Sequence, residues 1–161
     1  MKILMVCLGN ICRSPLAEAV LRKKVFEHGL NWVIESAGTN GYHVGEAPFH
    51  LTQKVAEAHH LNISDLRARK FVPSDMEQFD KIYVMAADVL EEVQQIAGKH
   101  FIPEKVDYFL NELYPGKNAD LMDPWYGGYD GFEKVYELID QTCTAIITSY
   151  AIPLPSNQAQ L

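Results

Sequence analysis

The chain has 161 residues, 48% of them hydrophobic and 22% charged, which is the size and composition of a single soluble globular domain. A formal net charge of −7 argues against nucleic acid as the main partner, and no apolar run is long enough to span a membrane. Residues 1–10 already hold a strand pattern and a cysteine, which leaves no room for a cleaved signal peptide. We therefore expect a cytoplasmic protein that binds neither membranes nor nucleic acid.

The cysteines and histidines argue against disulfides and against a metal site. Cys7, Cys12 and Cys143 show no Cys-x-x-Cys spacing, and three cysteines suit a reducing compartment better than a disulfide framework. None of the six histidines stands at zinc-ligand spacing from another histidine or from a cysteine. We expect no metal.

The apolar pattern predicts strands that alternate with helices. Residues 2–7 are apolar on both faces, which predicts a buried strand, and helical spacing of apolar residues follows over 15–29. The further elements expected are a strand over 32–36, a helix over 49–60, a short helix starting over 71–75, a strand over 81–85, a helix over 86–97, a weaker strand over 106–110, a long loop over 111–130 and a helix over 131–151. We expect one domain over 1–151 and a flexible tail over 152–161.

This alternation predicts an α/β fold, in which a parallel sheet lies between layers of helices. In such sheets, ligands bind beyond the carboxyl ends of the strands, at a topological switch point. The segment that follows the first strand lies at such an end, and the long loop over 111–130 is of a length that is usually functional.

The segment 7–15, CLGNICRSP, combines a cysteine with the parts of an anion-binding loop. Loop amides that converge at a helix N-terminus bind anions, and the planar guanidinium of Arg13 holds two phosphate oxygens at once. The same positive field favours the thiolate of Cys7 over the thiol, which predicts a nucleophile near neutral pH.

Three small residues are predicted to shape this loop. Gly9 is expected to adopt a positive φ and to let the backbone approach an anion closely. Asn10 tolerates the left-handed conformation and is expected to lock the loop through its side-chain amide. The hydroxyl of Ser14 is expected to donate to the sulfur of Cys7, which stabilises the thiolate.

Phosphoryl transfer to sulfur also needs an acid for the leaving group, and Asp123 is the candidate. Pro124 disfavours the helical conformation at Asp123 and so fixes how the carboxyl group is presented. Trp125 and Tyr126 are expected to form a wall that stacks on an aromatic substrate ring.

Together, the segments 6–19 (VCLGNICRSPLAEA) and 123–126 (DPWY) resemble the low-molecular-weight protein tyrosine phosphatases. The similarity covers essentially residues 1–150, including SAGT at 36–39, RAR at 67–69 and FDKI at 79–82. The resemblance implies a three-layer α/β/α fold of the phosphotyrosine phosphatase I type, with a four-stranded parallel sheet. It also implies hydrolysis of phosphotyrosine and aryl phosphates without a cofactor.

The resemblance also assigns roles to individual residues. Cys7 attacks the phosphoryl group, Arg13 and the loop amides stabilise the transition state, and Asp123 protonates the leaving phenol and then activates water. The residues expected to bind substrate or phosphate are Leu8, Gly9, Asn10, Ile11, Cys12, Ser14, Tyr42, Trp125 and Tyr126, with Ser36 in a supporting role. The expected partner is a phosphotyrosine-containing protein, and the expected state is a monomer or a weak homodimer.

Some residues keep two interpretations. The resemblance implies a reversible disulfide between Cys12 and Cys7 that protects the nucleophile, whereas Cys12 is otherwise a small buried packing residue. Tyr42 is either an aromatic wall of the pocket or an ordinary surface tyrosine, and His43 either tunes specificity or is an exposed loop residue. Cys143 lies in an apolar helical stripe and is expected in the core.

The chain departs from the family pattern at three positions. Leu66 stands where a histidine often helps to hold the loop asparagine, so Asn10 must be held by other groups, for which Ser14 and Ser36 are the candidates. Ala86 replaces an acid after the third strand, and Phe49 stands where an aspartate is often found. These changes bear on loop rigidity and substrate choice rather than on the reaction class.

Three other functions are considered. An arsenate reductase on this scaffold needs a further cysteine pair near residues 80–90, which is missing here. A phosphocysteine carrier of sugar transport would have no use for Arg13 and Asp123. A non-catalytic phosphotyrosine-binding protein is disfavoured because Cys7, Arg13 and Asp123 are all present.

Overall fold

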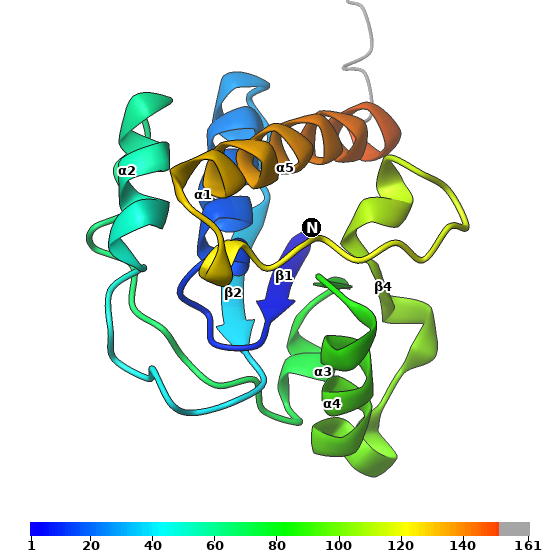
Figure 1. Cartoon of the computed structure of the whole chain (residues 1–161). Coiled ribbons are helices and arrows are strands. Elements are labelled where there is room, and N and C mark those ends of the chain that lie inside the picture. The colour runs from blue at the N-terminus through cyan, green and yellow to red at the C-terminus, as the bar shows by residue number, and fades with distance from the viewer. Residues whose placement is uncertain (152–161) are drawn as a thin grey trace, which may run out of the picture.

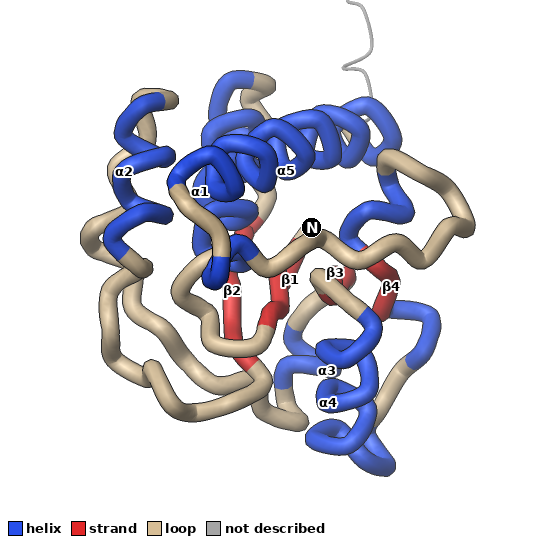
Figure 2. Tube along the Cα trace, in the orientation of Figure 1, coloured by secondary structure: helices blue, strands red, loops and turns tan. Residues whose placement is uncertain are grey.

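The computed structural model describes residues 1–151 of the chain and is built on a parallel sheet of four strands in the order β2-β1-β3-β4 (Figures 1 and 2). The strands are β1 (Lys2–Cys7), β2 (Val33–Gly38), β3 (Lys81–Val84) and β4 (Val106–Tyr108). β1 lies between β2 and β3, and Cys7 is in register with Gly38. The chain leaves β1 toward β2 on one side and returns to β3 on the other, so the end of β1 is the switch point of the sheet.

Helices cover both faces of this sheet. The side chains of Ile3 and Met5 share one buried cluster with α1 (Arg13–Glu27), α2 (His50–Ala58) and α5 (Tyr129–Tyr150). Leu4 and Val6 point to the opposite face, where they pack with α3 (Asp75–Gln78) and α4 (Ala87–Ala97). This alternation along β1 is the two-residue period of a strand, and burial of both faces explains why the strand is apolar throughout. The three-layer α/β/α prediction is confirmed.

Most predicted elements are present with shifted ends. α1 begins at Arg13 rather than at residue 15, α3 (Asp75–Gln78) begins at the last residue of its expected start, and β4 is shorter than expected. Four 3₁₀ helices were not predicted, and they are Gly98–His100, Pro103–Lys105, Phe109–Glu112 and Pro124–Tyr126. The last two lie at or within the expected loop over 111–130, so that region is less irregular than its composition predicted. The expected tail over 152–161 lies outside the described residues.

No helix in the described part of the chain is both long and apolar enough to cross a membrane. Figure 1 places the loop that follows β1 close to the turn before α5, although these segments are far apart in the sequence. The sheet order and these two connections position the candidate site.

Candidate active site

The loop between β1 and α1 has one left-handed residue, and it is Asn10, with φ of 58°. Gly9 does not have a positive φ, so the prediction for Gly9 was wrong and the one for Asn10 is confirmed. Space still limits Gly9, because a Cβ atom there would lie 3.0 Å from Cδ2 of His43. The loop therefore turns at Asn10 and passes closely under His43 at Gly9.

The side chain of Asn10 holds the loop through three hydrogen bonds. Its Nδ2 donates to Oγ of Ser14 at 2.8 Å and to Oγ of Ser36 at 2.9 Å. Its Oδ1 accepts from the backbone N–H of Arg69 at 3.0 Å. The predicted partners Ser14 and Ser36 are confirmed, and the backbone of Arg69 is a third partner that was not predicted. Asn10 is thus fixed although Leu66 replaces the histidine of the family.

The same network reaches the sulfur of Cys7. Oγ of Ser14 lies 2.9 Å from Sγ of Cys7, in a buried environment. Oγ of Ser14 accepts a hydrogen bond from Asn10, and its own hydrogen has two acceptors within reach, Sγ of Cys7 at 2.9 Å and the carbonyl oxygen of Ala37 at 3.5 Å. The expected contact between Ser14 and Cys7 is confirmed.

Gly38, at the end of β2, allows this loop to lie against the sheet. A Cβ atom at Gly38 would stand 2.6 Å from the carbonyl oxygen of Leu8 and 3.0 Å from the backbone nitrogen of Asn10. Gly38 also donates its N–H to the carbonyl of Arg69 at 2.8 Å and accepts from the N–H of Phe71 at 2.7 Å. These bonds bring the segment that contains Arg69 beside the loop.

Arg13 is buried at the first turn of α1 and points toward the segment before α5. Its Nη1 donates to the carbonyl oxygen of Leu121 at 3.0 Å. Its Nη2 lies 3.6 Å from Oδ2 of Asp123, whose side chain is 38% exposed. The guanidinium is therefore oriented by one backbone acceptor and one carboxylate, and it meets the candidate acid directly.

Asp123 is presented by a local turn, as the following proline predicted. Its backbone is extended, with φ of −74° and ψ of 116°, and its Oδ1 accepts from the N–H of Trp125 at 3.0 Å. The ring of Trp125 packs against Phe49 with centroids 4.5 Å apart. Phe49 in turn donates its backbone N–H to the carbonyl of Ile11 at 2.8 Å. Phe49 therefore links the turn that carries the acid to the loop that carries the nucleophile.

A cavity of about 210 Å³ lies between these segments. Its lining residues are Cys7, Leu8, Gly9, Ile11, Cys12, Arg13, Asn40, His43, Asp123 and Trp125. Ser14 and Ser36 support the loop from behind and do not line the cavity. Tyr42 is 86% exposed and does not line it either, whereas its neighbour His43 does. The side chain of Tyr126 lies outside the described part of the structure.

The cysteines fall into two environments. Cys7 and Cys12 both line the cavity, and all three cysteines are free thiols in the described chain. Burial raises the pKa of Cys12 to about 12, with a smaller opposing contribution from Thr52, so Cys12 is a thiol at neutral pH. Cys143 is fully buried in the core, as predicted.

Three residues near the site were not identified from the sequence, and a fourth, Phe49, was noted only as a departure from the family pattern. Asn40 lines the cavity, Phe49 supports the acid turn, and Gly38 and Arg69 support the nucleophile loop. Gly38 and Arg69 belong to the motifs SAGT and RAR. These motifs supported the family resemblance but did not assign a role to either residue. Their roles depend on contacts between distant segments, which no local pattern reports.

The family is established by comparison with known proteins. The family model for low molecular weight phosphotyrosine protein phosphatase matches residues 2–152. The chain belongs to this family. A low molecular weight phosphotyrosine protein phosphatase of Schizosaccharomyces pombe is 39% identical over 143 residues, covering 86% of this chain and 90% of that protein.

Solved structures of similar proteins share the fold of this phosphatase. The crystal structure of YfkJ from Bacillus subtilis has a TM-score of 0.85 at 33% identity and covers 92% of this chain and 93% of that one. A Drosophila arginine phosphatase has a TM-score of 0.86 at 29% identity and covers 96% and 100%. The predicted four-stranded fold of the phosphatase family is thereby confirmed.

Proposed function

We propose that this phosphatase hydrolyses phosphotyrosine in proteins through a phosphocysteine intermediate, with Cys7 as nucleophile, Arg13 as phosphate-binding group and Asp123 as acid and base. The single observation that carries the assignment is that these three side chains line one cavity, although Asp123 comes from a distant segment. A nucleophile, an oxyanion-binding guanidinium and a carboxyl group are the set that this two-step reaction needs.

In the first step, the thiolate of Cys7 attacks phosphorus and forms an S–P bond, while the bond from phosphorus to the phenolic oxygen breaks. The protonated carboxyl of Asp123 transfers its proton to that oxygen, so tyrosine leaves neutral. The guanidinium of Arg13 binds the equatorial phosphoryl oxygens, and the hydroxyl of Ser14 stabilises the thiolate before attack.

In the second step, water attacks phosphorus and the S–P bond breaks. The carboxylate of Asp123 accepts a proton from this water, and the thiolate of Cys7 leaves with the hydrogen bond of Ser14 in place. Inorganic phosphate is released and Asp123 is again protonated. Each group therefore returns to its starting form without a cofactor.

The cavity walls favour an aromatic phosphate ester. Ile11 and the ring of Trp125 offer apolar surface on which a phenol ring packs. We assign a monomer or a weak homodimer acting in the cytoplasm, where a reducing environment keeps Cys7 available for attack. Tyr42 is exposed and absent from the cavity lining, so we assign it no contact with the phosphate group.

The test is hydrolysis of a phosphotyrosine peptide by the wild type, Cys7→Ser and Asp123→Ala, with Cys143→Ala as the matched cysteine control. We expect Cys7→Ser to be inactive, Asp123→Ala to be slowed about 100-fold or more, and Cys143→Ala to retain activity. Rapid acid quench should trap phosphate on Cys7. Undiminished turnover by Cys7→Ser would exclude the covalent mechanism.

The same assay separates the competing functions. Because an arginine phosphatase shares this fold, phosphoarginine is tested beside phosphotyrosine at equal concentration. Preference for phosphoarginine would overturn the assignment of phosphotyrosine. Stoichiometric phosphorylation of Cys7 without turnover would favour a phosphate carrier, and arsenate reduction without phosphatase activity would favour a reductase.

A further inference from the structure

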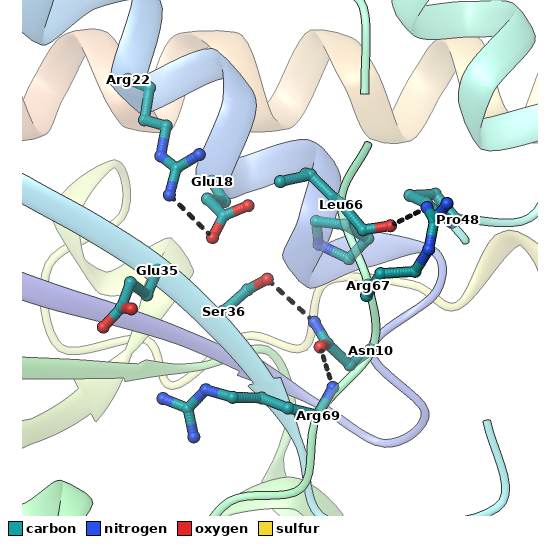
Figure 3. Close-up of a pocket in the computed structure, with 10 residues that line it drawn as sticks. Asn10, Glu18, Arg22, Glu35, Ser36, Pro48, Leu66, Arg67 and Arg69 are labelled. Carbon is teal, nitrogen blue, oxygen red and sulfur yellow. Dashed lines mark hydrogen bonds and ion pairs between the residues drawn. The ribbon is translucent and has the colours of Figure 1, made fainter. Parts of the chain in front are cut away.

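A second cavity, of about 130 Å³, borders the nucleophile loop at Asn10 (Figure 3) and shares no lining residue with the catalytic cavity. Asn10 and Ser36 line it together with Glu18 from α1, Glu35 from β2 and Arg69. None of these charged residues takes part in the reaction proposed above. The cavity nevertheless borders the hydrogen bonds that hold the loop.

Glu18 is the unusual group in this cavity, because it is an acidic side chain that is only 6% exposed. Its Oε1 lies 3.5 Å from Nη2 of Arg22, whose Nε is fixed on the carbonyl of Ile34 at 2.9 Å. Its Oε2 is buried and has no hydrogen-bond partner among the described residues. An unpartnered buried oxygen is costly, so it calls for an explanation beyond packing.

The groups around Glu18 act on the pKa of its carboxyl group in both directions. Burial raises the pKa of Glu18 to about 7, and the neighbouring carboxylate of Glu35 acts in the same direction. Arg22, the backbone N–H of Ser36 and Arg69 oppose this rise by favouring the charged form. The remaining cation at the cavity, Arg67, donates to the carbonyls of Ser64 and Leu66 and is directed away from Glu18 (Figure 3).

Two of the groups that favour the charged form also hold Asn10. Ser36 lines the same cavity as Glu18, its backbone N–H favours the charged form of Glu18, and its hydroxyl accepts from Asn10. Arg69 donates its backbone N–H to Asn10, and its guanidinium is bound to Asp75 by two hydrogen bonds of 3.0 and 3.1 Å. Figure 3 shows Glu18, Ser36, Asn10 and Arg69 around one space.

We propose that Glu18 is a positioning residue for the nucleophile loop, which acts on Asn10 through Ser36 and Arg69 and holds the loop more firmly when its carboxyl group is ionised. The ionised carboxylate attracts the N–H of Ser36 and the cations on both sides of it. The neutral form weakens that attraction, so Asn10 is held less firmly. The loss of restraint then passes through hydrogen bonds from Asn10 to Ser14 and from Ser14 to Cys7. This inference rests on the proposed function of Cys7.

The test compares kcat on an aryl phosphate for the wild type and Glu18→Gln across pH, because glutamine mimics the neutral carboxyl. The ratio of wild type to variant cancels the titrations of substrate, Cys7 and Asp123 that both proteins share. We expect a ratio near unity at about pH 5.5 and about fivefold at about pH 8.5, the effect of roughly one net hydrogen bond. The midpoint should lie near 7, the pKa of Glu18.

Two variants that keep Glu18 shift this midpoint in opposite directions. Glu35→Gln removes a negative neighbour and should move the midpoint to lower pH, whereas Arg22→Gln removes a positive one and should move it higher. A merely structural role of Glu18 would not produce opposite shifts. If Glu18→Gln fails to fold, the rate of each variant divided by the wild-type rate carries the test, because near pH 7 this ratio should exceed unity for Glu35→Gln and fall below unity for Arg22→Gln. Glu27→Gln, exposed on the same helix, is the control and should match the wild type at every pH.

A second measurement separates this proposal from the proposed function. The rate at which iodoacetate alkylates Cys7 reports the loop without any turnover, and it should show the same pH-dependent ratio. Inactivity of the wild type on every phosphate ester would overturn the proposed function while leaving this measurement valid. A ratio independent of pH in alkylation, or equal midpoints in Glu35→Gln and Arg22→Gln, would overturn the role of Glu18.

Discussion

Nη2 of Arg13 and Oδ2 of Asp123 lie 3.6 Å apart, and this contact joins the nucleophile loop to the turn before α5. The phosphate-binding group and the acid of the proposed reaction are therefore direct neighbours before chemistry begins. A bound phosphate ester brings negative charge to Arg13 and competes with the carboxylate of Asp123 for the guanidinium group.

Replacing Asp123 by asparagine should slow the hydrolysis of phosphate esters, and the effect should be largest for esters with the poorest leaving groups. The amide keeps the shape of the side chain but has no acidic proton for the phenolic oxygen. We expect kcat to fall about 100-fold or more on phenyl phosphate and roughly tenfold or less on dinitrophenyl phosphate, whose leaving group needs no proton. Steady-state rates on a series of aryl phosphates check this, and an equal loss on all of them would contradict the role as acid.

Gly38→Ala should disturb the nucleophile loop from the neighbouring strand. The added Cβ would lie 2.6 Å from the carbonyl oxygen of Leu8, a backbone atom that moves only with the loop. We expect a loss of about 1–3 kcal/mol in the free energy of unfolding, measured in urea, together with weaker binding of inorganic phosphate. Gly41→Ala is the matched control, because its Cβ would meet only a lysine side chain at 3.9 Å. Equal behaviour of the two variants would contradict the close approach.

Cys12 should act as a slow protective partner for Cys7. Peroxide converts the thiolate of Cys7 to a sulfenic acid, and the thiol of Cys12 then displaces water to form the disulfide that the family resemblance implies. Because its pKa is raised to about 12, Cys12 is mostly protonated at neutral pH, and we expect disulfide formation to accelerate as pH rises. Peptide mapping after mild peroxide checks the linkage. Full recovery of oxidised Cys12→Ser by dithiothreitol would contradict the protective role.

Glu18→Gln should be more stable than the wild type at alkaline pH. Folding raises the pKa of Glu18 from 4.5 to about 7, so the native state binds more protons than the unfolded state between these values. The stability contributed by Glu18 therefore falls as pH rises through this window and stays low above it. At about 1.4 kcal/mol per pKa unit, the variant should gain at most about 3 kcal/mol at about pH 8 and almost nothing at about pH 4.5. Urea unfolding at a series of pH values checks this, and a difference that shrinks with rising pH would contradict it.

The three groups of the proposed reaction were selected from the sequence because each belongs to a local pattern, and the structure brings them to one cavity. A strand, a cysteine loop and a helix start placed Cys7 and Arg13 together, and the proline after Asp123 predicted its extended backbone. The prediction failed for Gly9, since composition alone does not say which loop residue takes the left-handed conformation. Asn10 takes the left-handed conformation, and its side chain also forms hydrogen bonds with three different segments.

The residues that hold the site required the tertiary structure. Tyr42 and His43 are adjacent in the sequence, and only the path of the loop decides that His43 lines the cavity while Tyr42 is exposed. Phe49 stood out as a departure from the family, and its contact with Trp125 gives it a role in supporting the acid turn.

The sequence by itself determined the family and its reaction class, because the residues proposed as nucleophile, phosphate-binding group and acid are recognisable from their neighbours in the chain. Only the tertiary structure decided how that chemistry is held in place. Gly38, Arg69 and Glu18 meet the nucleophile loop from other elements, and their effects depend on close packing and burial. Packing and burial arise when segments distant in sequence come together, so no local pattern contains them.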